Sequence, residues 1–178
     1  MKRILGALAG LTLVAAAAAP AAAQNVDDMR TLRFGVQGGV SMPMGDFGEI
    51  ANLGFLVGGL LDVQPAGMPV GFRFNVDYQR WGADDAVGVD NFNSLSGTGA
   101  VMFTVPTTGG ISPYVLGGVG MYRSNCGGND ACEASNDFGF NLGGGLNFGL
   151  GTLDTGVELR YHNVDDSSFI TIPFIIRF

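Results

Sequence analysis

The last ten residues of the chain, Phe169–Phe178, read FITIPFIIRF and decide the fold. Alternate side chains of an extended strand point to the same face, so this stretch presents one continuous apolar face to its surroundings. The residues of that face are Ile170, Ile172, Phe174, Ile176 and Phe178. The stretch is too short and too rich in β-branched residues to be a membrane-spanning helix. Because a single strand leaves backbone N–H and C=O groups unpaired on both edges, the rest of the sequence must supply neighbouring strands.

The N-terminus has the pattern of a secretory signal peptide. Lys2 and Arg3 precede an apolar run that ends in Pro20 and three alanines, which favours cleavage after Ala23 over retention as an anchor. We therefore expect a signal peptide at residues 1–23 and one mature domain at residues 24–178.

The composition excludes several classes of protein. The predicted mature chain keeps seven arginines, all sixteen acidic residues and no lysine, which gives a formal net charge of −9. Such acidity argues against a nucleic-acid partner, which requires a basic surface. Charged residues make up only 14% of the sequence, and a water-exposed surface without lysine is hard to build. No second apolar block reaches the 18 or so residues that a membrane-spanning helix needs.

Apolar and polar residues alternate in eight segments that are bounded by turn residues, and the pattern is clearest where Phe72, Phe74, Val76 and Tyr78 alternate with polar residues. The predicted strands are Thr31–Ser41, Leu53–Val63, Val70–Trp81, Ser94–Val105, Ile111–Arg123, Asp137–Phe148, Thr152–Asn163 and the final Phe169–Phe178.

The connections between these strands alternate between long and short. The long ones are Met42–Asn52, Gly82–Asn93 and Ser124–Asn136, with a shorter acidic one at Val164–Ser168. Even strand number, strands of about ten residues and long loops at one end are typical of a transmembrane β-barrel. The sequence thus predicts an all-β fold, an eight-stranded antiparallel up-and-down transmembrane β-barrel.

The sequence resembles the small eight-stranded outer-membrane barrels of Gram-negative bacteria, the OmpX-like or opacity-protein-like, porin-related family. The resemblance lies in Pro113–Tyr122, Gly139–Phe148, Val157–Tyr161 and the terminal Phe178. It implies an outer-membrane location with both termini in the periplasm and the long loops at the cell surface. It also implies that the assembly machinery reads the terminal strand through Ile170, Ile172, Phe174, Ile176 and Phe178. Pro173 departs from the pattern, and we expect a bulge or a lost ladder bond there.

A soluble barrel with an apolar cavity would show the same alternation. The polar faces favour the membrane barrel, because they carry Gly, Asn, Ser, Thr and Gln with few charges. These faces are then interior, and antiparallel register places Asp154 opposite Arg177 and brings Asp62 near Arg33 and Arg73. The predicted interior ion-pair network, which would fill the barrel and leave no wide pore, is Arg33, Asp62, Arg73, Asp77, Asp154, Glu158, Arg160 and Arg177.

Catalysis and metal binding have weak support. His162 is the only histidine, and Asp165, Asp166, Ser167 and Ser168 follow it, but no oxyanion hole is evident and a rim histidine in a polar interior is the commoner case. We predict that the protein is not an enzyme and has no cofactor or metal site. Carboxylates of the acidic loops, Asp84, Asp85, Asp90, Asp165 and Asp166, lack the spacing of a calcium loop, although bound cations could bridge them to lipopolysaccharide phosphates.

Cys126 and Cys132 lie close together in a polar loop and have no neighbouring histidine, so we expect a disulfide bond after export. The predicted function is that of an outer-membrane barrel with a structural, adhesive or surface-interaction role. Lipid A modification and a narrow channel are the alternatives. The expected partners are outer-membrane lipid, lipopolysaccharide and the assembly machinery, and we expect a monomer.

Overall fold

The computed structural model describes residues 32–65, 67–84, 89–108, 110–127, 134–150 and 153–178. The predicted signal peptide at residues 1–23 lies outside these ranges, as does Cys132.

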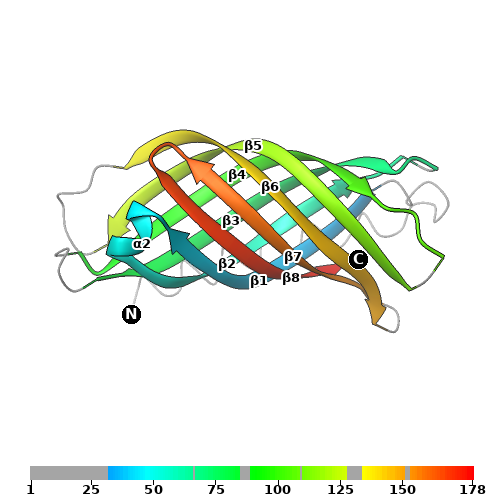
Figure 1. The fold of residues 1–178 in the computed structure, drawn as a ribbon, viewed down its shortest axis with the longest axis horizontal. Coiled ribbons are helices and arrows are strands. Elements are labelled where there is room, and N and C mark those ends of the chain that lie inside the picture. The colour runs from blue at the N-terminus through cyan, green and yellow to red at the C-terminus, as the bar shows by residue number, and fades with distance from the viewer. Residues whose placement is uncertain (1–31, 66, 85–88, 109, 128–133, 151–152) are drawn as a thin grey trace, which may run out of the picture. The chain divides into compact units, whose positions relative to one another are not determined.

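Eight strands and one short helix form the barrel (Figure 1). They are β1 (Leu32–Met44), α2 (Asp46–Ile50), β2 (Ala51–Val63), β3 (Val70–Ala83), β4 (Asn91–Thr104), β5 (Ile111–Gly127), β6 (Ser135–Leu150), β7 (Leu153–Val164) and β8 (Ser167–Arg177). Each strand pairs antiparallel with its neighbours in sequence, and β8 pairs with β1, so the sheet closes in the order β1 to β8. The predicted fold class is confirmed.

The terminal stretch closes the ring as expected. Its pairing with β1 runs in constant register from Gly35 opposite Arg177 to Met44 opposite Ser168, and Phe178 N donates to Phe34 O at 2.9 Å. Closure leaves no free sheet edge, which a barrel in an apolar solvent requires.

Pro173 interrupts the hydrogen-bonded pairing between β8 and β7. The register is the same on both sides, with Val157 opposite Phe174 and Arg160 opposite Thr171, so there is no bulge. Glu158 and Leu159 do not pair with β8 across this gap, because proline has no N–H to donate. The expectation of a lost ladder bond is confirmed.

The strands reach further into the long connections than the alternation indicates. β5 continues to Gly127, β6 starts at Ser135, and the β7–β8 connection shrinks to a two-residue turn at Asp165 and Asp166. The first long connection contains the unpredicted helix α2. Local turn residues do not fix where a ladder ends, because cross-strand hydrogen bonds continue wherever two strands stay in register.

The barrel is apolar outside and polar inside. Large apolar side chains cover the outer wall, for example Phe74 at 52%, Val76 at 62% and Leu142 at 64% exposure, whereas the inward side chains of the same strands are largely polar and buried. No helix among the described residues is long and apolar enough to cross a membrane.

Candidate functional site

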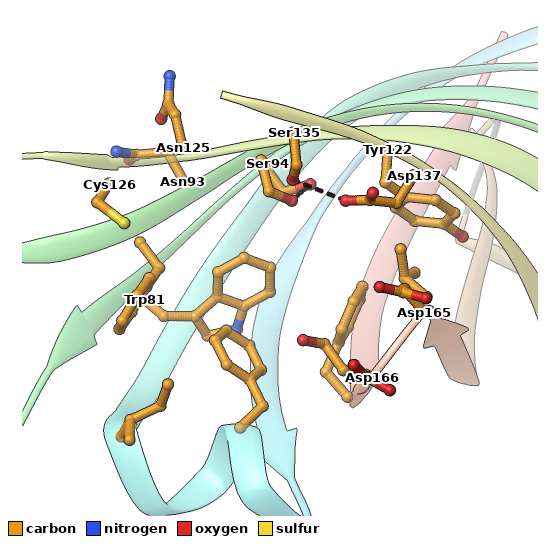
Figure 2. Close-up of a pocket in the computed structure, with 17 residues that line it drawn as sticks. Trp81, Asn93, Ser94, Tyr122, Asn125, Cys126, Ser135, Asp137, Asp165 and Asp166 are labelled. Atoms are coloured by element: carbon orange, nitrogen blue, oxygen red, sulfur yellow. Dashed lines mark hydrogen bonds between the residues drawn. The ribbon is translucent and has the colours of Figure 1, made fainter. Parts of the chain in front are cut away.

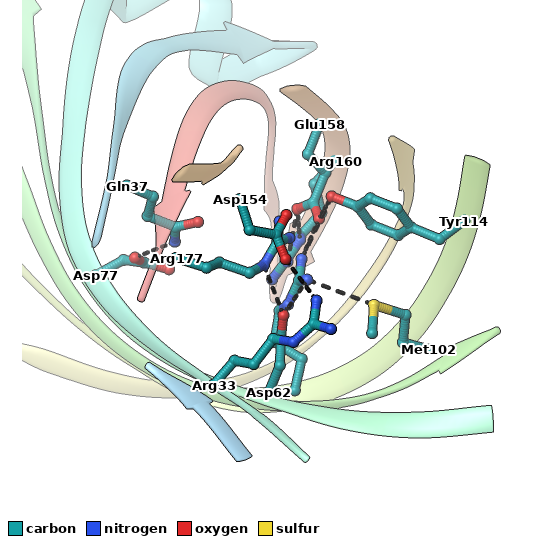
Figure 3. Close-up of polar contacts among 11 residues, drawn as sticks. Arg33, Gln37, Asp62, Asp77, Met102, Tyr114, Asp154, Glu158, Arg160 and Arg177 are labelled. Atoms are coloured by element: carbon teal, nitrogen blue, oxygen red, sulfur yellow. Dashed lines mark hydrogen bonds and ion pairs between the residues drawn. The ribbon is translucent and has the colours of Figure 1, made fainter. Parts of the chain in front are cut away.

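Arg73 is fully buried inside the barrel. Figure 3 labels its partners Asp62, Tyr114 and Glu158 among the polar contacts of the interior. Arg73 Nε and Nη2 donate to the two carboxylate oxygens of Asp62 at 2.6 and 2.8 Å, and its Nη1 donates to Glu158 Oε2 at 2.6 Å. The first pair is bidentate, the strongest geometry for a guanidinium and a carboxylate.

Further donors satisfy the same two carboxylates. Glu158 accepts from Arg160 Nε at 2.7 Å and from the Tyr114 hydroxyl at 2.7 Å, while Asp62 also accepts from Arg177 Nε at 2.9 Å. Six side chains from β2, β3, β5, β7 and β8 thus form one connected layer across the barrel. Buried charges with this many partners cost far less than isolated ones.

Arg33 and Asp154 lie at the end of the barrel formed by the short turns. They form an ion pair at 2.5 Å, and Arg177 Nη1 approaches Asp154 Oδ1 at 3.5 Å. The predicted register of Asp154 opposite Arg177 is confirmed. Asp62 is the cross-strand neighbour of Arg33, as expected, yet the guanidinium of Arg33 pairs with Asp154, because a long side chain at the open end can reach across the lumen.

Asp77 is interior, as expected, but it does not join the ion pairs found among the described residues. It accepts a hydrogen bond from Gln37 Nε2 at 2.5 Å. The void beside it, lined in part by Arg160 and His162, is about 10 Å³, which leaves room for one water molecule at most.

A pocket of about 330 Å³ opens at the long-loop end of the barrel (Figure 2). Its apolar lining is mostly aromatic and comes from four strands and the helix: Phe47, Trp81, Phe92, Tyr122 and Phe169. The rings pack edge to face, with centroids of Phe47 and Trp81 5.3 Å apart and those of Trp81 and Phe169 5.2 Å apart. The helix α2 therefore acts as a partial cap, because it places Phe47 over Trp81.

The rim of this pocket is acidic. Asp137, Asp165 and Asp166 line it, and Ser135 Oγ donates to Asp137 at 2.7 Å. Below the aromatic lining, Trp81 Nε1 donates to Ser41 Oγ at 3.0 Å, so the polar interior begins directly beneath the pocket.

His162 has the inward parity of β7, near the long-loop end, and it is enclosed by its neighbours, with 2% exposure. Its Nδ1 is 2.9 Å from the Tyr122 hydroxyl and its Nε2 is 3.2 Å from Thr171 Oγ1, while its ring stacks on Phe169 at 4.6 Å. Both ring nitrogens are occupied by neutral hydroxyl groups, so the ring is held as a structural element of the wall.

Cys126 lines the pocket, but its predicted partner Cys132 lies outside the described residues, so the disulfide stays a prediction. In the described part of the chain, no three His, Cys, Asp or Glu side chains lie close enough together to hold a metal ion, and Asp85 is not among the residues described. The predicted assembly-signal residues Ile170, Ile172, Phe174, Ile176 and Phe178 lie on the outward face of β8 and its end, while the inward side chains Phe169, Thr171, Pro173, Ile175 and Arg177 are buried.

The sequence analysis missed the aromatic pocket. Trp81 and Phe169 occupy alternating positions that point into the barrel, and both lie at the long-loop end of their strands. Together these two features of the sequence could have predicted an aromatic pocket there. Phe47 gave no such signal, because it lies on a helix inside a predicted loop.

Comparisons with known proteins are informative at the level of the fold. No protein-family model matches the sequence, and neither does any curated protein. Neisserial surface protein A (NspA) is similar in structure, with a TM-score of 0.65 and 16% identity over 82% of this chain and 95% of that chain. The chain has the fold of the small eight-stranded outer-membrane barrels.

Two further structures agree with this assignment. Ail, the attachment invasion locus protein of Yersinia pestis, has a TM-score of 0.52 and 19% identity over 83% of this chain and 97% of that chain. The outer membrane enzyme PagL has a TM-score of 0.52 and 16% identity over 83% of this chain and 98% of that chain. One barrel architecture thus carries surface proteins and an enzyme, so the fold does not fix the activity.

Proposed function

We propose that the protein is an integral outer-membrane β-barrel with a surface-interaction role and a plugged interior. One observation carries the proposal: the barrel is apolar on its outer wall and polar inside. Burying exposed apolar surface in lipid is worth about 25 cal/mol per Å². A water-soluble barrel would need the reverse arrangement.

The direction of insertion follows from the charges and the resemblance. Asp137, Asp165 and Asp166 lie at the long-loop end, which we place at the cell surface, and the described chain ends at the opposite end, which we place in the periplasm. The similar barrels support the outer membrane as the location, at the level of fold.

The proposal is tested by membrane fractionation with gel mobility. A closed barrel has no unpaired sheet edge, so it stays folded in SDS until boiled and its band shifts on heating. We expect the mature protein in the outer-membrane fraction with such a heat-dependent shift. Recovery as a soluble periplasmic protein would refute the proposal.

The pocket at the long-loop end supports the surface-interaction role. An aromatic lining with three carboxylates at its rim favours ligand groups that are apolar and cationic, through cation–π and charge attraction. Trp81 is the single tryptophan of the sequence and lines this pocket, so its fluorescence reports entry of a ligand.

This role is tested with a matched pair of small probes, tyramine and its neutral N-acetyl derivative. Tyramine should quench Trp81 at lower concentration than the neutral compound. Equal quenching by both compounds would argue that the acidic rim of the pocket does not select cationic ligands.

A further inference from the structure

Two arginines differ from the others in the described chain. Arg33, Arg73, Arg160 and Arg177 each form an ion pair. Arg80 and Arg123 are exposed and have no carboxylate partner among the described residues. Two cations without a carboxylate partner in the described part of a strongly acidic chain suit an external anionic partner.

Both side chains point outward from the barrel wall. Arg80 continues the outward face of β3 after Phe74, Val76 and Tyr78, and Arg123 continues that of β5 after Val119 and Met121. The central strand β4 joins them, because Arg80 pairs with Asn93 and Arg123 pairs with Leu95 on it. Two inter-strand spacings and a two-residue offset along β4 separate their backbones by roughly 12 Å, so guanidinium groups on long side chains can reach a shared ligand.

The wall is hollowed at this place. A groove of about 460 Å³ is lined by Tyr78, Asn93, Ser94, Leu95, Arg123 and Asn125. The Tyr78 hydroxyl donates to Asn93 Oδ1 at 2.8 Å. The lining thus combines polar groups with the tyrosine ring and one aliphatic side chain, Leu95.

The groove lies at the boundary of the apolar belt. On β3, β4 and β5 the last outward apolar or aromatic residues before the long loops are Tyr78, Leu95 and Met121, and the next outward residues are Arg80, Asn93 and Arg123. In a membrane barrel this is the level of the lipid headgroups.

We propose that Arg80 and Arg123 bind phosphate groups of an outer-leaflet glycolipid, with its acyl chains along the apolar wall beside Leu95 and Met121. Guanidinium groups bind phosphate through paired, charge-assisted hydrogen bonds. The inference rests on the proposed membrane function and adds a ligand and a place. It also differs from a cation bridge, because the contact is direct and needs no divalent metal.

The test uses the mature protein, isolated from membranes in mild detergent and reconstituted into vesicles that contain lipid A. Arg80→Gln and Arg123→Gln should each weaken lipid A binding about tenfold, and the double variant should lose more. Arg80→Lys with Arg123→Lys should keep part of the binding because it keeps the charge. Asn163→Ala, a change at an outward polar position near the long-loop end of β7, is the control and should bind as the unchanged protein does.

Two further arms identify the bound chemistry. Dephosphorylated lipid A should bind the unchanged protein as weakly as lipid A binds the double variant, and millimolar inorganic phosphate should not displace the lipid. Displacement by inorganic phosphate would identify a free-anion site and overturn the lipid proposal. Lipid A binding in EDTA that is equally strong in the unchanged protein and the double variant would also overturn it.

Failure of this inference differs from failure of the proposed function. Heat-shifted, membrane-inserted variants with unchanged lipid A binding would overturn the role of the two arginines alone. Absence of heat-shifted protein in the unchanged sequence would overturn the membrane barrel itself. If the double variant does not insert, the comparison of lipid A with dephosphorylated lipid A on the unchanged protein still tests whether phosphate groups are bound.

Discussion

Arg73 shows how one residue organises the interior of this barrel. It is fully buried and contacts both Asp62 and Glu158, which in turn accept from Arg160 and Arg177. Removing its charge would leave two carboxylates short of a partner in a place that water does not reach. Breaking one member of a buried ion network costs more than the network itself contributes.

Arg73→Ala should therefore lower the free energy of unfolding by about 3–5 kcal/mol. Arg33→Gln is the matched control, because Arg33 has a half-exposed side chain and its pair with Asp154 should be worth about 1 kcal/mol or less. Urea unfolding in lipid vesicles, followed by Trp81 fluorescence, measures both. Equal losses in the two variants would contradict the ranking.

At the scale of elements, the seam between β1 and β8 is the step that closes the barrel. Pro173 pairs with Gly39 there, and the ladder on its other side is interrupted. A Cβ on Gly39 would lie 2.1 Å from Ile172 O and 2.7 Å from Pro173 Cα. The seam thus depends on close approach of the two backbones at Gly39.

Gly39→Ala should weaken closure, at a cost of about 1–3 kcal/mol from the forced backbone shift. Gly38→Ala is the adjacent control, since its Cβ would have Leu56 O as nearest neighbour at an ordinary 3.7 Å. The fraction of heat-shifted protein after refolding is the readout. A Gly39→Ala barrel that closes as well as Gly38→Ala would show that the seam can relax freely.

The outward face of β8 carries the proposed assembly signal. Phe178 is 67% exposed, so its side chain contributes little to packing within the barrel. Phe178→Ala should lower outer-membrane assembly several-fold in cells and leave refolding in detergent unchanged. Phe138→Ala, an outward phenylalanine on β6 with 63% exposure, should leave both unchanged. Normal assembly of Phe178→Ala would refute the signal.

At the scale of the whole molecule, eight strands enclose a lumen that side chains can fill. The charged layer around Arg73 and the aromatic packing of Trp81 and Phe169 lie one behind the other along it. We expect no stable conductance from the refolded protein in planar bilayers, because an ion would have to displace this network. Discrete, reproducible channel openings would favour the narrow-channel alternative over the plugged barrel.

The sequence by itself determined the strand number and the antiparallel order, because a period of two in side-chain direction is a local property of extended backbone. The scarcity of charges on the polar faces then indicated which face lies inside. The sequence also determined that Asp154 faces Arg177, since register follows from turn position. Only the tertiary structure decided which acid each arginine contacts, that His162 is buried, and that Phe47, Trp81 and Phe169 form one pocket. These depend on side chains reaching across the lumen between strands that are not adjacent, and no periodicity along a single strand encodes that distance.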